Sequence, residues 1–266
     1  MKLKFLGFAL LAVCVCAVCC MCGSDSKTPD YEFPDGPDPD PDPQPGDYPA
    51  GLTVTEFTDD LGGGKQCLGF VAVADLKANP KLRFNAVHLP QQKIPSRIHA
   101  EFASANRGTA CVTTNAGYWW AGNSLSLLVT GGTVKSIENQ TVTRNNQTVY
   151  PVRSSFGQMS SGKFETHWIY CVLDDGNKPY AFPSALDNDE RTNTYMSAPP
   201  TSKTPGAVLW TPQEAVGGGP MLVKEGKNVA VENYWKEVFD GGGIAGTSRQ
   251  PRTAIGATAD GKLILL

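Results

Sequence analysis

Three short motifs contain the residue types that could bind or cleave a polar substrate. The first runs from Thr114 through Asn115, Ala116 and Gly117 to Tyr118 and Trp119, directly after an apolar run. An amide side chain both donates and accepts hydrogen bonds. Aromatic faces can stack on the C–H surfaces of a sugar. The motif therefore indicates either a sugar-binding loop or a structural turn with core aromatics, and chemistry alone does not choose between them.

The second motif is Gly217-Gly218-Gly219-Pro220, followed by Met221-Leu222-Val223. Consecutive glycines allow close backbone approach, and their N–H groups can form an anion-binding nest. The alternative is a flexible loop or bulge. The segment is not a Walker loop, because no Gly-Lys-Ser/Thr follows it.

The third motif, Gln250-Pro251-Arg252-Thr253, precedes the apolar residues Ala254 and Ile255. An arginine at the start of a buried strand requires a partner, and its planar fork suits phosphate or carboxylate. We expect Arg252 to bind an anion, with a structural salt bridge as the alternative.

The remaining polar residues give weaker signals. Asp240 precedes three glycines and is interpreted as a solvated turn acid, and Glu237 as an exposed residue of a helical turn. Asp174 and Asp175 have the form of turn residues. The histidines, His88, His99 and His167, have no partner at metal-ligand spacing, so no metal site is predicted. The need for a cofactor stays open.

The elements that must position these motifs are mostly short β-type runs separated by glycine turns. Hairpins are predicted around Gly131-Gly132, Asn145-Asn146, Glu225-Gly226 and Asp260-Gly261. The clearest helix is expected over 95–106, and Thr211-Pro212-Gln213-Glu214 has the form of a capping box that predicts a further helical turn. We therefore predict an α+β fold: a mixed, mostly antiparallel twisted sheet with many hairpins and a few packed helices.

The N-terminal fifty residues differ from the rest of the chain. Lys2 and Lys4 precede an apolar run with five of the eight cysteines, which predicts an export signal over 1–22. Cys22 is the expected lipidation site of a bacterial lipoprotein, and an ordinary cleaved signal is the alternative. Residues 23–50 are rich in Asp and Pro and predict an extended tether. We expect a protein of the bacterial cell envelope that is held to a membrane by its lipid.

Residues 51–266 are expected to form one domain. The first fifty residues carry a net charge of −5, and the remainder carries +2. This balance excludes nonspecific nucleic-acid binding. The three cysteines of the domain, Cys67, Cys111 and Cys171, allow either one disulfide with a free thiol or three buried thiols.

The three motifs, in this order, resemble those of the phosphodiester glycosidase domain, the family that includes the catalytic domain of the mannose 6-phosphate uncovering enzyme and bacterial relatives. The similarity spans roughly 51–266. It implies hydrolysis of a sugar-1-phosphodiester, such as an N-acetylglucosamine derivative, to a sugar and a phosphomonoester.

The resemblance also implies roles for individual residues. Arg252 and Asn115 would be catalytic, with Arg252 holding the phosphate and Asn115 the sugar or the phosphate. The substrate-binding residues would be Gly117, Tyr118, Trp119, Gly218, Gly219 and Thr253. Relatives carry further acidic motifs after the strand that matches Lys262–Leu266, so we expect a C-terminal part to be missing. The alternative function is a surface lipoprotein that binds glycan or phosphate without turnover.

Overall fold

The fold is mostly β, and the predicted α+β class is wrong. The computed structural model describes residues 9–14, 48–60, 62–89, 93–104, 108–120, 123–138, 140–240, 246 and 251–266. These residues are 40% strand and 9% helical, with two α-helices and a large curled antiparallel sheet. The hairpins are too numerous, and the helices too short, for the helices to form a layer of their own.

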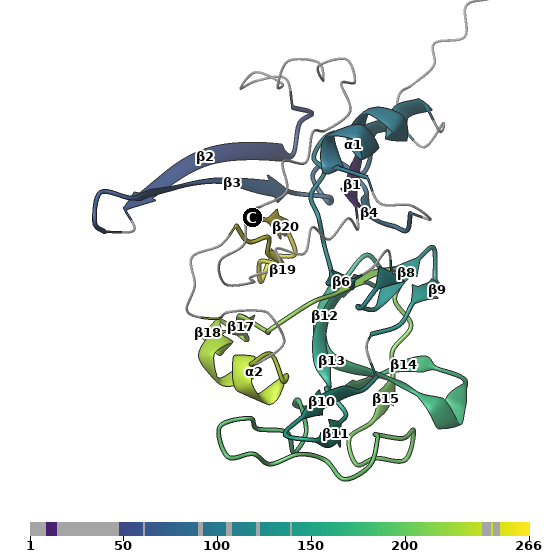
Figure 1. Ribbon diagram of the computed structural model, residues 1–266. Coiled ribbons are helices and arrows are strands. Elements are labelled where there is room, and N and C mark those ends of the chain that lie inside the picture. Colours follow the sequence, from purple (N-terminus) through teal and green to yellow (C-terminus); the bar gives the residue numbers. More distant parts are fainter. Residues whose placement is uncertain are drawn as a thin grey trace, which may run out of the picture.

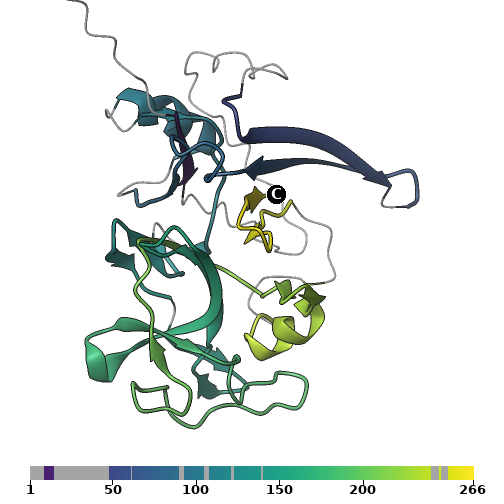
Figure 2. The same ribbon diagram turned by 180° about the vertical axis from the view of Figure 1, so that it is seen from behind.

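The largest sheet has seven strands in the order β15-β14-β13-β12-β16-β8-β9, and neighbouring strands are antiparallel. Figures 1 and 2 show that it curls strongly. Its strands are β8 (Leu128–Thr130), β9 (Thr133–Ser136), β12 (Arg153–Gln158), β13 (Phe164–Val172), β14 (Lys178–Phe182), β15 (Val208–Leu209) and β16 (Glu214–Gly217).

The second half of strand β13, from Trp168 to Val172, is buried on both faces. Ile169 and Cys171 belong to one apolar cluster, whereas Trp168, Tyr170 and Val172 belong to another. The curled sheet is therefore covered on both sides at this strand, which removes the polar face that an alternating strand needs.

A second, four-stranded antiparallel sheet has the order β19-β20-β3-β2. Its strands are β2 (Leu52–Asp60), β3 (Gln66–Ala74), β19 (Ile255–Ala257) and β20 (Leu263–Leu265). Strands β2 and β3 form a long hairpin whose outer half projects from the body as an arm (Figure 1).

A small parallel sheet has β1 (Ala9–Cys14) between β4 (Phe84–Val87) and β5 (Thr109–Ala110). Helix α1 (Pro95–Ser104) packs beside it, and Ile98 and Phe102 of the helix form a buried cluster with Val87 and Ala110. Helix α1 lies within the range 95–106 over which the sequence predicted the clearest helix.

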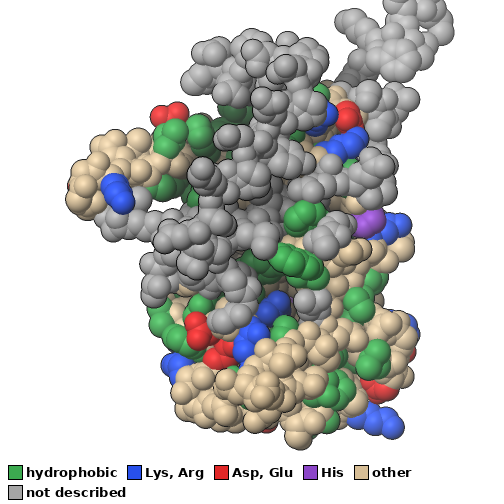
Figure 3. All heavy atoms as spheres, in the orientation of Figure 1, with side chains coloured by type: hydrophobic (Ala, Val, Ile, Leu, Met, Phe, Trp, Pro, Cys, Tyr) green, Lys and Arg blue, Asp and Glu red, His purple; other side chains and the backbone are tan. Residues whose placement is uncertain are grey.

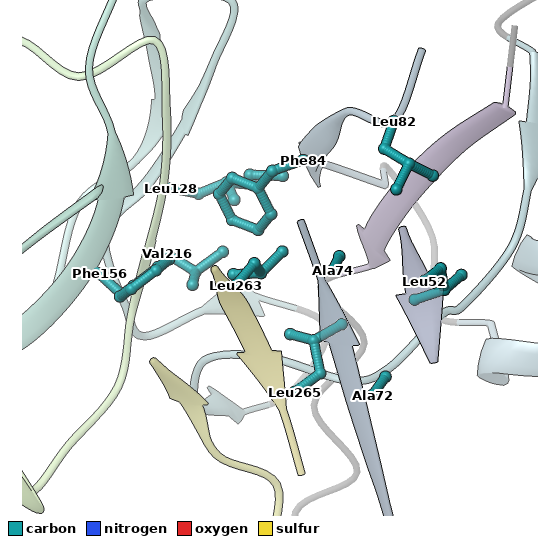
Figure 4. Packing of buried hydrophobic residues seen from close by; sticks show 11 residues of the cluster. Leu52, Ala72, Ala74, Leu82, Phe84, Leu128, Phe156, Val216, Leu263 and Leu265 are labelled. Atoms are coloured by element: carbon teal, nitrogen blue, oxygen red, sulfur yellow. The ribbon is translucent and has the colours of Figure 1, made fainter. Parts of the chain in front are cut away.

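The main core joins the two antiparallel sheets. Leu263 and Leu265 of β20 lie among Phe84, Leu128 and Phe156 (Figure 4). The ring centroids of Phe84 and Phe156 are 5.9 Å apart in an edge-to-face arrangement. Because strands from both ends of the domain contribute, this core fixes β19 and the residues before it against the large sheet.

The remaining elements are short. They are β6 (Trp119–Trp120), β7 (Asn123–Ser124), β10 (Val142–Arg144), β11 (Gln147–Val149), β17 (Val223–Lys224), β18 (Lys227–Asn228), the 3₁₀ turn Leu173–Asp175 and helix α2 (Ala230–Lys236). The pairs β6–β7, β10–β11 and β17–β18 are antiparallel hairpins. Turn residues Asn145, Asn146 and Gly226 have positive φ, as the predicted hairpin turns require.

The capping box at Thr211-Pro212-Gln213-Glu214 does not begin a helix. Glu214 is the first residue of β16, and its carboxylate accepts hydrogen bonds from the backbone N–H groups of Ala86 and Gly131, both at 2.9 Å. Strands β12 and β8 supply backbone hydrogen bonds on both sides of β16, and this pairing overrides a local helix signal.

Several other predictions meet the structure only in part. Cys171 is buried, whereas Cys67 and Cys111 are partly exposed, so the three thiols are not all buried. Cys22 and most of the tether lie outside the described residues. Neither helix among the described residues is long and apolar enough for a membrane crossing.

Candidate functional site

The first and third motifs meet through a hydrogen bond between residues 138 positions apart. Thr253 Oγ1 donates to Asn115 Oδ1 at 2.5 Å. Asn115 lies in the irregular segment after β5, and Thr253 lies just before β19. The antiparallel β19–β20 pairing and the shared core position Thr253, so the amide of Asn115 is fixed from the opposite end of the domain.

Arg252 lies on the surface beside this contact. Its side chain is exposed, and Nη1 donates to the carbonyl of Pro251 at 3.1 Å. The arginine therefore precedes the strand at the edge of the domain and is not buried within it. Its exposure suits contact with a charged ligand.

The first and second motifs also meet directly. The Tyr118 hydroxyl donates to the Gly219 carbonyl at 2.6 Å, and the Tyr118 backbone N–H donates to Ser126 Oγ at 2.8 Å. Gly117 packs so closely that an added Cβ would lie 2.5 Å from Ser126 Cβ and 2.8 Å from the Gly217 carbonyl. Glycine is therefore required at position 117 for this close approach. Trp119 follows in β6 and is partly buried.

The glycines of the second motif do not form an anion nest as a group. The N–H of Gly217 donates to the Leu127 carbonyl at 2.7 Å, and the N–H of Gly218 donates to the Ser154 carbonyl at 3.0 Å. Gly218 nevertheless borders open space, because an added Cβ would meet no atom within 4 Å. This residue offers room beside the backbone, and its N–H is already used.

Gly219 has a different requirement. Its φ is +112°, and an added Cβ would lie 2.5 Å from Glu237 Oε2 and 2.8 Å from the ring of Phe239. Glycine is therefore needed here for both conformation and space. The peptide bond from Gly219 to Pro220 is cis.

Glu237, predicted to be exposed, is fully buried beneath this glycine segment. One carboxylate oxygen accepts from Trp168 Nε1 at 3.0 Å and from the N–H of Met221 at 2.8 Å. The other accepts from the N–H and the hydroxyl of Ser154 at 2.9 and 3.0 Å. Burial raises the pKa of Glu237 to about 7, and the four hydrogen bonds act in the opposite direction.

Glu237 thus fastens strand β12, strand β13 and the residue after the cis proline to the end of α2. One sequence signal could have found it: an acidic residue directly before Val238 and Phe239, which are both buried. Its partners Ser154 and Trp168 are distant in sequence, so the pattern alone could not name them.

The other acidic candidates lie outside this group. Asp240 is exposed, with its N–H donating to Glu190 Oε2 at 2.6 Å. Asp174 accepts from Ser202, and Asp175 pairs with Lys178, as expected of turn residues. Across the part of the chain that the structure describes, no group of three His, Cys, Asp or Glu residues could hold a metal ion.

The assembled residues can bind a polar ligand in two ways. Asn115 and Thr253 offer an amide and a hydroxyl for sugar hydroxyls or a phosphate oxygen. Arg252 offers a guanidinium for an anion. In Figure 3, acidic and basic side chains lie close together on the face near α2.

Comparison with known proteins gives one match. Residues 171–266 match the family model described as Phosphodiester glycosidase. No curated protein and no solved structure matches the chain significantly. The match supports a glycosidase-like function and a carbohydrate-derived substrate in general terms. Over residues 171–266, which contain the second and third motifs, the chain is a match to the phosphodiester glycosidase family, as the resemblance of its motifs predicted.

Proposed function

We propose that the protein hydrolyses a sugar-1-phosphodiester, such as an N-acetylglucosamine-1-phosphodiester, to a free sugar and a phosphomonoester. The observation that carries this proposal is the pair of contacts Thr253–Asn115 and Tyr118–Gly219, which brings the three motifs together. The match to the phosphodiester glycosidase family supports the same reaction class.

In this reaction water adds to the anomeric carbon, and the bond from that carbon to the phosphate oxygen breaks. The electron pair of that bond leaves with the phosphate, and the proton that the water loses ends on the phosphomonoester. A phosphate ester is a good leaving group, so the demand for a general acid is smaller than in ordinary glycoside hydrolysis. The site must hold the phosphate charge and stabilise the oxocarbenium character of the sugar.

The residues divide between these two tasks. Arg252 is exposed and binds the phosphate, while Asn115, fixed by Thr253, binds a sugar hydroxyl or a phosphate oxygen. Gly218 leaves room for the ligand, and Gly117 and Gly219 permit the close packing of the backbone around it. Tyr118 and Trp119 line the sugar side.

The direct test is sugar release from N-acetylglucosamine-1-phospho-methyl ester. The assay uses the 266-residue chain and a form that includes whatever the reading frame encodes after Leu266. We expect Asn115→Ala and Arg252→Ala each to reduce release by about 100-fold or more, since groups that stabilise transition-state charge contribute at this level. Arg191→Ala is the matched control, because Arg191 is an exposed arginine that pairs with Asp189.

Each outcome has a distinct meaning. Release only by the longer form places further catalytic groups after Leu266. Unchanged sugar release by Arg252→Ala would contradict the proposal that Arg252 binds the phosphate. Binding of the ester by folded protein with no release from either form would replace hydrolysis by a glycan- or phosphate-binding function.

We further propose that the protein is exported and lipid-anchored through Cys22 in the bacterial cell envelope. The basic, apolar leader and the Asp/Pro-rich segment after it support this proposal. Labelled palmitate should be incorporated by the wild type and lost in Cys22→Ser, but retained in Cys16→Ser. Equal labelling of Cys22→Ser and the wild type would contradict it.

A further inference from the structure

A second arginine lies at the end of strands β12 and β16 where the glycine segment begins. Arg153 begins β12, which pairs with β16 in the register Ser155↔Gly217. The N–H of Gly218 also donates to the Ser154 carbonyl. Continuing the same antiparallel register places Arg153 across from Gly219, on the same face of the sheet.

The guanidinium of Arg153 is held in place without an ion pair. Nε donates to the carbonyl of Glu237 at 3.2 Å, and one Nη donates to the carbonyl of Val238 at 3.0 Å. The centre of the guanidinium lies 4.4 Å from the centroid of the Phe239 ring. The same ring is 5.4 Å from the ring of Tyr118, so Arg153 and Tyr118 share one aromatic neighbour.

These contacts use two of the five N–H groups that an arginine offers. Within the described ranges, the other three have no hydrogen-bond partner, and no carboxylate lies within ion-pair distance. Arg153 is partly exposed. Burial lowers the pKa of Arg153, whereas Tyr118 and Glu237 act in the opposite direction.

Arg144 provides a contrast within the same cluster. It also donates to the Val238 carbonyl, at 3.3 Å, but its Nε forms an ion pair with Glu190 at 2.7 Å. Both arginines therefore bind the end of α2, and only Arg153 keeps an uncompensated guanidinium edge. A partly buried charge without a direct counter-charge is costly unless a ligand supplies one.

We propose that Arg153 binds a phosphoryl oxyanion of the ligand, as a second cation of the candidate site in addition to Arg252. A guanidinium fork matches two oxygens of a phosphate, and the shared contact with Phe239 places this guanidinium in one aromatic cluster with Tyr118 of the candidate site. This inference rests on the proposed function, because it assigns the phosphate of that substrate to a position near Gly219.

The test measures binding and does not require turnover. Inorganic phosphate and N-acetylglucosamine 1-phosphate are titrated into the full chain and followed by calorimetry. We expect Arg153→Gln to weaken the binding of both by about 10- to 100-fold, since it removes charge-assisted hydrogen bonds. Arg153→Lys keeps the charge but not the two-pronged hydrogen bonding of the guanidinium, so its affinity should lie between those of the wild type and Arg153→Gln. Arg144→Gln is the matched control and should leave both affinities within about threefold.

A second readout separates ligand binding from a structural role. Phosphate should raise the melting temperature of the wild type and of Arg144→Gln, because it binds the folded state, but not that of Arg153→Gln. If Arg153→Gln does not fold, the same comparison is made with Arg153→Lys, for which loss of affinity is expected.

Unchanged phosphate affinity in a folded Arg153 variant would overturn the inference, as would the absence of any phosphate binding by the wild type. The proposed hydrolysis can fail separately. Arg153-dependent phosphate binding without sugar release would leave the inference in place and remove the enzyme. Full sugar release by Arg153→Gln would support the proposed hydrolysis and overturn the inference about Arg153.

Discussion

Two buried glutamates show how differently one residue type can be used in this fold. Glu237 lies under the glycine segment and accepts four hydrogen bonds, two on each oxygen. Glu138 follows β9 and is also buried, with one oxygen accepting from the N–H of Cys171 at 2.5 Å. Its other oxygen has no hydrogen-bond partner among the described residues.

The Glu237 carboxyl therefore connects several elements through hydrogen bonds, whereas the Glu138 carboxyl is buried and accepts a backbone hydrogen bond from Cys171. Glu237 connects β12, β13 and the residue after the cis proline to α2, so its loss would release several segments at once. Burial raises the pKa of Glu138 and of the neighbouring Cys171 thiol. Such a group fits the apolar surroundings best in its neutral form.

The largest expected effect is that of Glu237→Gln, measured against the same change at Glu138. Glu237→Gln places an NH₂ group against two existing donors, and leaving two buried donors unpaired costs about 4 kcal/mol in the free energy of unfolding. Urea denaturation measures this loss. Glu138→Gln is the matched comparison. Equal losses at the two positions would show that burial, and not hydrogen bonding, determines the role of each carboxyl.

The pH dependence of stability provides the next effect. A carboxyl whose pKa is raised in the folded state binds its proton more tightly than in the unfolded chain. The contribution of Glu237 to the free energy of unfolding is therefore fully present below about pH 4.5 and is lost as the pH rises through about 7. A shift of this size corresponds to about 3 kcal/mol. Denaturation between pH 4 and 8 should show this decline, and Glu237→Gln should flatten it. A stability that rises through this window would contradict the assignment to Glu237.

A smaller effect is expected when Glu237 loses one donor only. Trp168→Phe keeps an aromatic ring in the core but removes the Nε1 hydrogen bond, at a cost of about 1 kcal/mol. Thermal unfolding measures it, with Trp210→Phe as a control because Trp210 donates to the less buried Glu165. A cost near that of Glu237→Gln would mean that the four hydrogen bonds act as a single unit.

The smallest effect belongs to Glu138→Gln. The Gln carbonyl can still accept from Cys171 N–H, and the other terminal atom of the side chain replaces an oxygen that has no partner among the described residues. We expect a change within about 1 kcal/mol at pH 7. Urea unfolding at pH 6 and 8 would reveal it, and a loss of several kcal/mol would indicate a partner of Glu138 outside the described residues.

The same contrast shows what sequence can and cannot predict here. Hairpin turns such as Asn145-Asn146 and Gly131-Gly132 were correctly located, because positive φ is a local requirement that Asn and Gly satisfy. The position of α1 was also predicted, because its range lies within 95–106. The helical turn predicted from the capping box at Thr211–Glu214 is wrong, because strand pairing with distant segments outweighs this local signal.

The candidate site was predictable as three motifs, but not as a geometry. Nothing local in the sequence shows that the Tyr118 hydroxyl binds the Gly219 carbonyl, or that Gly218 already uses its N–H. Glu237 was assigned to the surface because its four donors come from residues 16 to 83 positions away. Long-range polar contacts of this kind leave no periodic pattern.

The projecting arm has a consequence for handling the protein. Its inner half supplies Leu52 and Ala72 to the core, while Leu68 and Phe70 of β3 remain 60% and 54% exposed. Among the described strands, β20 covers the outer edge of β3 only at residues 72–74. An open apolar strand edge favours self-association. Concentrated preparations should therefore aggregate through the arm, and a lysine in place of Leu68 is a first choice for improving solubility.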